Sequence, residues 1–430
     1  MAFHCRRPVK SLVCMTKLLF YKFMNGVGMT ESHGFSPTKA TLLTILLCSM
    51  LMLMGGAAVA PALPLIEQVF PDQGTLVSMI ITVPSLAVGL VGFAMGALAD
   101  RLGKVRVLST SLVVFTVAGV VGFLMDGSSD EQLYVLLAFR FIVGIGIAGI
   151  SSSVTALIAE YYGGMNRIKV LSYQSAAMGL GVLILEYTGG LLAEFSWREP
   201  FLVYLIGVPI LIMVLLTMRE PKRDVPEDVA RVVPERKANG RLLAVCYATI
   251  FIAMTMAFLL PTKMPTYLQT ELAVTTSATG LFLGVHGVTN ACMSLMYRRL
   301  VQRIPPFKII SIGFFLLAAS LVFLKISESI ASSIALMVVA GIALGMISPA
   351  VSNTLAAETT ATTSGKIMGG YSTCLNLGQF SISLISVPLF AAVGNSYPDL
   401  FAVMAVVAVV VGLTFIVLSR SSLATGKASA

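Results

Sequence analysis

Charged residues are scarce in this sequence. Asp, Glu, Lys and Arg together make up 11% of the 430 residues, whereas about 25% is usual in a soluble domain. The hydrophobic share of 57% is more apolar surface than a soluble fold keeps away from water. This imbalance excludes an ordinary soluble protein and favours one that lies in a lipid bilayer.

Several chemical motifs are missing as well. The six cysteines include no CxxC pair, so neither a disulfide framework nor a zinc site is expected, and we interpret the cysteines as small apolar fillers. The sequence contains no phosphate-binding GxxxxGKS/T loop and no recognisable nucleophile triad. We therefore predict no metal, no cofactor, no enzymatic activity and no use of ATP.

Twelve apolar runs are long enough to cross a membrane, which takes roughly 20 residues per helix. The runs are continuous and do not alternate with polar residues, so they indicate helices and not the strands of a closed barrel. We therefore predict an all-α membrane protein with twelve transmembrane helices in two six-helix bundles. The runs are 42–66, 75–97, 105–125, 133–157, 170–192, 201–218, 242–260, 278–296, 309–324, 330–347, 368–392 and 401–418.

Lys and Arg are distributed unevenly between the two sides of these spans. If both termini lie on one side, that side holds all 29 of them except Arg140, Arg198, Lys263 and Lys325. The opposite side carries the acids Glu67, Asp72, Asp126, Asp130, Glu131, Glu194 and Glu199. Because positive charge marks the cytoplasmic side, we predict a multi-pass protein of the plasma (inner) membrane with both termini in the cytoplasm. The net charge of +9 is then explained by the membrane surface and not by nucleic acid.

A single long polar stretch, residues 219–241, separates six apolar runs from the other six. The predicted parts are an N-terminal cytoplasmic arm (1–39), a first bundle (40–218), a cytoplasmic central loop (219–241), a second bundle (242–418) and a cytoplasmic tail (419–430). The arm has no signal-peptide core, and Met24 or Met29 is an alternative start to Met1.

The two halves show weak internal similarity. Pro61 and Pro64 are expected to end the first helix, and Pro261 and Pro265 the seventh. Lys263 lies between the second pair of prolines, and we expect it to extend toward the outer surface. Repeats of this kind place a transport path at the interface of the halves, near the middle of the membrane.

The loop between the second and third runs carries the most specific motif, which consists of Gly96, Asp100, Arg101, Gly103, Lys104 and Arg106. Asp100 is an acid in a basic loop, so we expect it to have a cationic partner or to cap a helix, and Gly103 allows a tight turn. The segment resembles the GxxxDRxGRR/K loop signature of the major facilitator superfamily. In that family the loop stabilises the outward-facing state, so the resemblance implies a gating role for Asp100 and Arg101.

Three further segments are similar to the drug:proton antiporter branch of that family. They are Gly55-Gly56 with Pro61-Ala-Leu-Pro64, Arg140 with Gly144 and Gly146, and Trp197-Arg198-Glu199-Pro200-Phe201. The fifth-helix motif departs from the family pattern, because Glu186 stands where the family has a proline before Gly189 and Gly190. The resemblance implies packing or hinge roles for these glycines and prolines.

Opposite charges lie inside two apolar runs, where an ionisable residue needs a partner or a task. At 1.5 Å per residue, Arg140 and Glu186 lie at similar depths, roughly 10 and 9 Å from the outer side. We hypothesise a buried Arg140–Glu186 pair that breaks when Glu186 is protonated, which would couple transport to protons. The alternative is a static salt bridge. His286 is either a proton or substrate contact or a packing residue.

Polar amides in the second half are candidates for lining a substrate cavity: Asn290, Asn353, Asn376 and Gln379. Such residues also simply join helices in membranes. The 23 methionines and 23 phenylalanines fit an adaptable apolar pocket.

These features predict a secondary active transporter. We expect a proton-coupled exporter of small amphipathic molecules that works by alternating access, with substrate, protons and the lipid bilayer as its partners. A metabolite uptake symporter of the same fold is one alternative, and a non-transporting membrane receptor is another. Nothing in the sequence requires more than a monomer.

Overall fold

The computed structural model describes residues 37–127, 129–220, 239–326, 329–359 and 363–419. The predicted arm (1–39), central loop (219–241) and tail (419–430) lie almost wholly outside the described residues. Within the described ranges the chain forms helices and no strands. In order they are α2 (Lys39–Leu51), α3 (Met54–Ala57), η1 (Ala60–Ala62), α4 (Leu63–Val69), α5 (Gly74–Leu102), α6 (Lys104–Val120), η2 (Val121–Leu124), α7 (Asp130–Tyr161), α8 (Gly164–Ala193), η3 (Glu199–Ile206), α9 (Gly207–Thr217), α10 (Gly240–Thr270), α11 (Thr276–Val301), α12 (Pro306–Ile326), α13 (Ile330–Ala357), α14 (Ser364–Ala392) and α15 (Tyr397–Ser419).

The predicted all-helical membrane fold is confirmed. Among the described residues, ten helices are long and apolar enough to cross a membrane, and the bent first span makes eleven if it is counted as one. The remaining predicted run, 278–296, lies in α11, which is too polar to be included by the same measure. Its polarity has a local cause, because α11 lines a central cavity that is described below.

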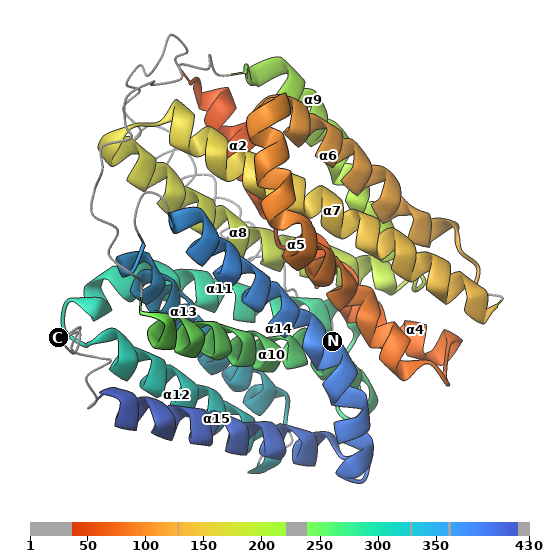
Figure 1. Ribbon diagram of the computed structural model, residues 1–430. Coiled ribbons are helices and arrows are strands. Elements are labelled where there is room, and N and C mark those ends of the chain that lie inside the picture. The colour runs from red at the N-terminus through yellow and green to blue at the C-terminus, as the bar shows by residue number, and fades with distance from the viewer. Residues whose placement is uncertain (1–36, 128, 221–238, 327–328, 360–362, 420–430) are drawn as a thin grey trace, which may run out of the picture.

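The helices form two halves, α2 to α9 in the upper part of Figure 1 and α10 to α15 in the lower part. Most helices pack against others of their own half, such as α5 and α6 against α7, or α12 against α13 and α15. The halves meet mainly where α8 packs along α11 and where α5 packs along α14. These four helices therefore bound the interface in which a shared cavity can form.

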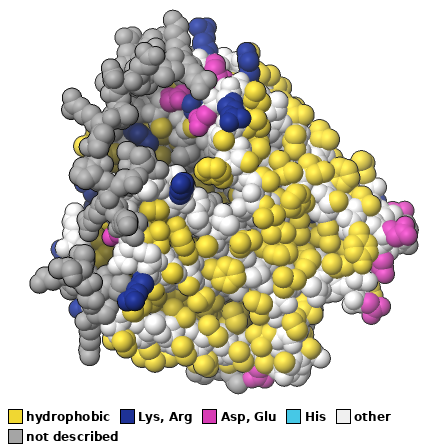
Figure 2. Space-filling view, in the orientation of Figure 1, with side chains coloured by type: hydrophobic (Ala, Val, Ile, Leu, Met, Phe, Trp, Pro, Cys, Tyr) yellow, Lys and Arg dark blue, Asp and Glu magenta, His cyan; other side chains and the backbone are white. Residues whose placement is uncertain are grey.

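Charge distinguishes the two ends of the helices. We call one the basic end, which carries Arg101, Lys104, Arg106, Arg167, Lys169, Arg298 and Arg299. We call the other the acidic end, which carries Glu67, Asp72, Asp130, Glu131 and Glu194. Large apolar side chains such as Phe93 and Leu216 are exposed, and yellow apolar side chains cover much of the face that Figure 2 shows. Lipid tails are the solvent that suits such a surface.

The first span is broken, and its prolines do not end it as predicted. The axes of Lys39–Leu51 and Met54–Val69 differ by 54°. Pro61 and Pro64 lie in the first turns of η1 and α4. In a first turn the N–H that proline lacks would have no helical acceptor, so the chain continues as a helix to Val69.

The prolines of the seventh span likewise lie inside a helix. Pro261 and Pro265 are internal residues of α10, which continues to Thr270. The prediction that they end this helix is wrong. Proline is tolerated inside membrane helices because neighbouring groups can satisfy the carbonyls that it leaves free.

Candidate functional site

A cavity of about 350 Å³ lies between the two halves. Its wall comes mainly from α8, α10 and α11, with contributions from the first span, α5, α13 and α14. On α8 the lining extends from Ser175 to Glu186, which is the middle of that helix. Because both halves contribute to the wall, a movement of one half relative to the other would change access to the cavity.

Two buried polar atoms of this cavity have no hydrogen-bond partner among the described residues: Oε2 of Glu186 and Nε2 of His286. Glu186 lies on α8 and is 6% exposed. His286 lies on α11, in the other half, and both side chains line the cavity. A buried polar atom without a partner costs about 1–3 kcal/mol. A ligand or proton that interacts with these atoms would therefore be bound favourably.

The rest of the wall is mainly apolar, with Met178, Val182, Met254, Phe258 and Leu283 among its residues. Two of the predicted amides, Asn290 and Gln379, also line it. The described lining includes no Lys or Arg, so Glu186 is the charged group in it. One acid in apolar surroundings favours a neutral or cationic amphipathic ligand over an anion.

The other two predicted amides lie outside this lining. Asn376 on α14 packs against Gly89 of α5, and its Nδ2 donates to the Ser372 carbonyl at 2.8 Å. Asn353 is exposed near the end of α13. Asn376 therefore lies at the contact between the halves, which is the alternative role considered for such residues.

Glycines allow α8 to approach two neighbours closely. A Cβ at Gly190 would lie against the backbone of α11, and a Cβ at Gly189 against the backbone of the first span. From α11, Gly280 faces the backbone carbonyl of Glu186. These contacts hold the Glu186 turn of α8 at the interface between the halves. Gly144 and Gly146 of α7 instead face the backbones of α5 and α6, inside the first half.

Arg140 lies in the core of the first half and does not line the cavity. It is 1% exposed. Its Nε donates to the Ile80 carbonyl at 2.6 Å, and its two Nη atoms donate to the Tyr204 hydroxyl and the Gly55 carbonyl. The guanidinium carbon lies 5.5 Å from the centre of the Tyr204 ring. All these partners belong to the first half.

The carbonyls that bind Arg140 are those that the helices leave free. In a regular helix the Ile80 carbonyl would accept a hydrogen bond from residue 84, but Pro84 has no N–H. The Gly55 carbonyl lies in the broken part of the first span, where the Val59 N–H donates to Gly56 instead. Arg140 therefore satisfies the backbone at two irregular points of neighbouring helices.

The predicted Arg140–Glu186 pair is wrong. Arg140 on α7 points toward α5 and the first span, whereas Glu186 on α8 faces the cavity and α11. Arg140 and Glu186 lie at similar predicted depths in the membrane, but depth does not determine which face of a helix a side chain occupies. Although α7 and α8 are consecutive, α8 packs mainly along α11 and α2.

The loop motif forms a charged cluster at the basic end. Lys104 Nζ contacts the Glu160 carboxylate at the end of α7 and lies 3.6 Å from Asp100. The Glu220 carboxylate accepts hydrogen bonds from the first backbone N–H groups of α6, where the helix dipole favours an acid. Gly103 has a φ of +106°, which a residue with a side chain rarely adopts.

The remaining residues of the motif make fewer contacts. Arg101 and Arg106 are exposed, and the Asp100 side chain is 68% exposed. A Cβ at Gly96 would lie 4.0 Å from Ser152 of α7, which is ordinary contact. Within the described residues, the ion pairs and hydrogen bonds of this loop join parts of the first half only. A gating role for the loop stays a prediction.

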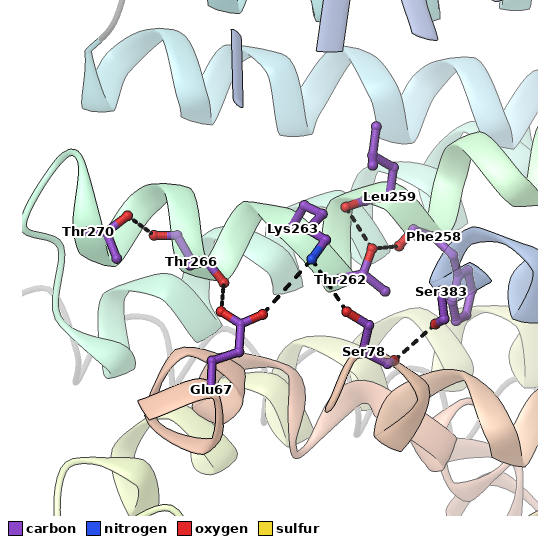
Figure 3. A network of polar contacts seen from close by, with 9 residues as sticks. All are labelled: Glu67, Ser78, Phe258, Leu259, Thr262, Lys263, Thr266, Thr270 and Ser383. Atoms are coloured by element: carbon purple, nitrogen blue, oxygen red, sulfur yellow. Dashed lines mark hydrogen bonds and ion pairs between the residues drawn. The ribbon is translucent and has the colours of Figure 1, made fainter. Parts of the chain in front are cut away.

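A second polar cluster joins the two halves at the acidic end (Figure 3). We call it the acidic-end cluster; it consists of Glu67 on α4, Ser78 on α5, Lys263 and Thr266 on α10, and Ser383 on α14. Lys263 Nζ lies 3.9 Å from Glu67 Oε1 and donates to Ser78 Oγ at 3.4 Å. Thr266 Oγ1 donates to Glu67 Oε2 at 3.1 Å, and Ser383 Oγ donates to the Ser78 carbonyl at 3.0 Å.

Sequence reasoning did not find this cluster. The prediction that Lys263 extends toward the outer surface is wrong, because its side chain is only 6% exposed and points into the interface between the halves. The available signal was symmetry: Glu67 and Lys263 lie near the corresponding prolines of the first and seventh spans and carry opposite charges. Neither residue by itself indicates that the other is its partner.

Two helical halves that share a cavity at their interface are typical of secondary transporters. The sequence profile described as Major Facilitator Superfamily matches residues 45–380 and 243–429. The chain belongs to the Major Facilitator Superfamily, and the prediction from the loop motif is confirmed.

Relatives with curated names include drug-resistance proteins. Multidrug resistance protein 1 of Bacillus subtilis (strain 168) is 30% identical over 222 residues, which cover 51% of this chain and 55% of that protein. Quinolone resistance protein NorA of Staphylococcus aureus is 26% identical over 186 residues, which cover 43% of this chain and 47% of that protein. The chain thus spans about half the length of these relatives. They agree with the predicted resemblance to the drug:proton antiporter branch.

Solved structures of transporters share the fold at low sequence identity. A bacterial homologue of the human lysosomal transporter Spinster, in an inward-facing and occupied conformation, matches with a TM-score of 0.72 and 17% identity over 90% of this chain and 98% of that one. The nucleoside transporter NupG matches with a TM-score of 0.72 and 11% identity over 88% of this chain and 100% of that one.

Proposed function

We propose that this protein is a proton-coupled exporter of small amphipathic molecules, with lipophilic cations preferred over anions. One observation carries the proposal: Glu186 Oε2 and His286 Nε2, which have no hydrogen-bond partner in the part of the chain that the structure describes, belong to one apolar cavity between the halves. The names of the drug-resistance relatives support export of such molecules. The protein acts as a monomer in this proposal, because one chain supplies both halves of the cavity.

Glu186 provides a simple basis for exchange. When its carboxyl group is protonated, the side chain is neutral and suits the apolar wall. When it is ionised, its charge attracts a cationic ligand, because an unpaired charge in an empty apolar cavity is unfavourable. A proton and a cationic substrate therefore compete for the same carboxylate, and a carrier that binds one or the other moves them in opposite directions. His286 lies in the opposite half and can donate or accept one hydrogen bond to the ligand.

In the proposed orientation the basic end faces the cytoplasm of a plasma membrane, because Lys and Arg mark that side. The acidic-end cluster then closes the outer side of the cavity. Toward the basic end, the described residues contribute one hydrogen bond between the halves, from Thr373 Oγ1 to the Gly89 carbonyl. The cavity would thus be loaded from the cytoplasm, as export requires.

The proposal is tested by efflux of a panel of cationic, neutral and anionic lipophilic dyes from cells that express the protein. Efflux is measured with and without a protonophore, for the wild type, for Glu186→Gln and for Glu194→Gln. Glu194 is the matched control, because it is an exposed acid directly after α8 and does not line the cavity. Expression of each variant is checked in the membrane fraction.

The expected result is protonophore-sensitive efflux of cationic dyes by the wild type and by Glu194→Gln, and none by Glu186→Gln at equal expression. Efflux that persists in Glu186→Gln and still collapses with the protonophore would remove Glu186 from the coupling step. Absence of efflux for every dye, together with uptake of a metabolite, would favour the symporter alternative and overturn export.

A further inference from the structure

The hydrogen bonds between the two halves are concentrated near the acidic end. Besides the acidic-end cluster, Gln269 Nε2 donates to the Pro61 carbonyl at 2.8 Å, and the hydroxyls of Thr82 and Ser383 lie 2.6 Å apart. In each case one residue belongs to the first half and the other to the second. Among these contacts the Glu67–Lys263 ion pair is the one formed by two full charges.

We propose that the Glu67–Lys263 pair is the closing contact of the acidic end, which forms when the cavity is shut on this side and breaks each time it opens there. The inference rests on the proposed transport by alternating access. It assigns a gating role to two residues outside the cavity and outside the loop motif at the basic end.

The position of the pair makes it sensitive to the separation of the halves. Glu67 lies on α4 and Lys263 on α10, and no residue of the loop motif contacts either of them. The Lys263 side chain is 6% exposed and the Glu67 side chain 23% exposed, so the two charges attract in surroundings that screen them poorly. Opening this end moves α4 away from α10 and admits water, which weakens the attraction and solvates both charges.

The neighbouring hydroxyls orient this pair. Thr266 Oγ1 donates to the Glu67 carboxylate, and Ser78 Oγ accepts from Lys263 (Figure 3). A buried charge that loses its partner is strongly unfavourable. Removing either charge should therefore destabilise the closed arrangement relative to the open one, in which the remaining charge is hydrated.

The experiment measures access to the acidic end directly and needs no substrate. The six native cysteines are replaced by alanine, and Ser383→Cys is introduced as a reporter, because Ser383 is fully buried between the halves at this end. The full-length protein in lipid nanodiscs is treated with a hydrophilic maleimide, and the labelling rate is followed by mass. The reporter protein is compared with Glu67→Gln, Lys263→Met, the swap Glu67→Lys with Lys263→Glu, and the control Glu194→Gln.

Each single variant of the pair should label at least roughly fivefold faster than the reporter protein, a change typical of a shifted conformational equilibrium. The swap should return the rate toward the reporter value, and Glu194→Gln should leave it unchanged. Equal rates in the reporter protein and both single variants would overturn the proposal. So would a swap that labels as fast as the single variants, because restoring the attraction would then have no effect.

A milder variant keeps the proposal testable if the single charge variants do not give monodisperse protein. Thr266→Val removes only the hydroxyl that orients Glu67, and it should raise the labelling rate by a smaller factor; no increase would count against the pair. The outcome is separable from that of dye efflux. Unchanged labelling with intact efflux removes the closing role alone, whereas accelerated labelling without transport of any dye removes the proposed export alone.

Discussion

Replacing Arg140 with methionine is expected to destabilise the first half without altering the proton dependence of whatever transport remains. The substitution leaves the buried Ile80 carbonyl without its side-chain donor, and the Gly55 carbonyl keeps only the 3.4 Å hydrogen bond from the Tyr204 hydroxyl. One unsatisfied buried carbonyl costs about 1–3 kcal/mol, and the weakened hydrogen bonding at Gly55 adds to that loss. Arg140→Lys should also be destabilising, because a single ammonium group cannot span three acceptors as the planar guanidinium does.

The assay is the fraction of detergent-solubilised protein that stays monodisperse after heating, followed by fluorescence-detected size-exclusion chromatography. Arg106→Met is the matched control, since Arg106 is exposed. Both Arg140 variants should lose monodispersity at a lower temperature than the wild type and the control. An Arg140→Met protein that is as heat-stable as the wild type but has lost proton-driven transport would refute the structural role, and would return Arg140 to the coupling residues.

Three further outcomes follow from the same geometry. Gly190→Val should lower the yield of folded protein, because its side chain would meet the α11 backbone, whereas Gly365→Val, at a position with open space, should not; both are measured by the same chromatography. Lys104→Met should lower the stability of the protein by about 1 kcal/mol or less, since the ion pairs of Lys104 are partly solvated. Arg106→Met should lower it still less, because Arg106 is exposed. The two variants are compared by the same heating assay. Phe258→Ala should enlarge the cavity and shift efflux toward bulkier dyes, as measured by competition between dyes of graded size.

The membrane fold could be predicted from the sequence, because hydropathy summed over a run of residues is enough to indicate a membrane span. Long apolar runs indicate spans, and the loop motif between the second and third runs indicates the family; the structure and the family match confirm both. The boundaries of the first span were less accessible. Pro61 and Pro64 suggest an end, but a helix can begin at proline as well as stop before it, and here α4 begins there.

The candidate site was predictable in part. Glu186, His286, Asn290 and Gln379 were singled out as polar residues in apolar runs, and all four line one cavity. Which residues face one another could not be derived, because it depends on how α8 rotates about its axis and which helices it meets. Arg140 shows this limit: its task is to bind carbonyls freed by a proline and by a helix break in other spans, and neither can be recognised from the Arg140 segment itself.

The polarity of α11 has a consequence for how the protein is made. A nascent helix enters the bilayer readily when it is apolar, and each polar residue near its centre makes that entry less favourable. α11 carries His286 and Asn290 in its middle, and it falls below the hydropathy that the neighbouring α10 reaches easily. We therefore expect its integration during synthesis to be aided by helices that are already in the membrane, among which α8 offers the matching glycine-lined face. On this expectation, the polar residues that suit the cavity to a ligand also make the insertion of α11 depend on the first half of the protein.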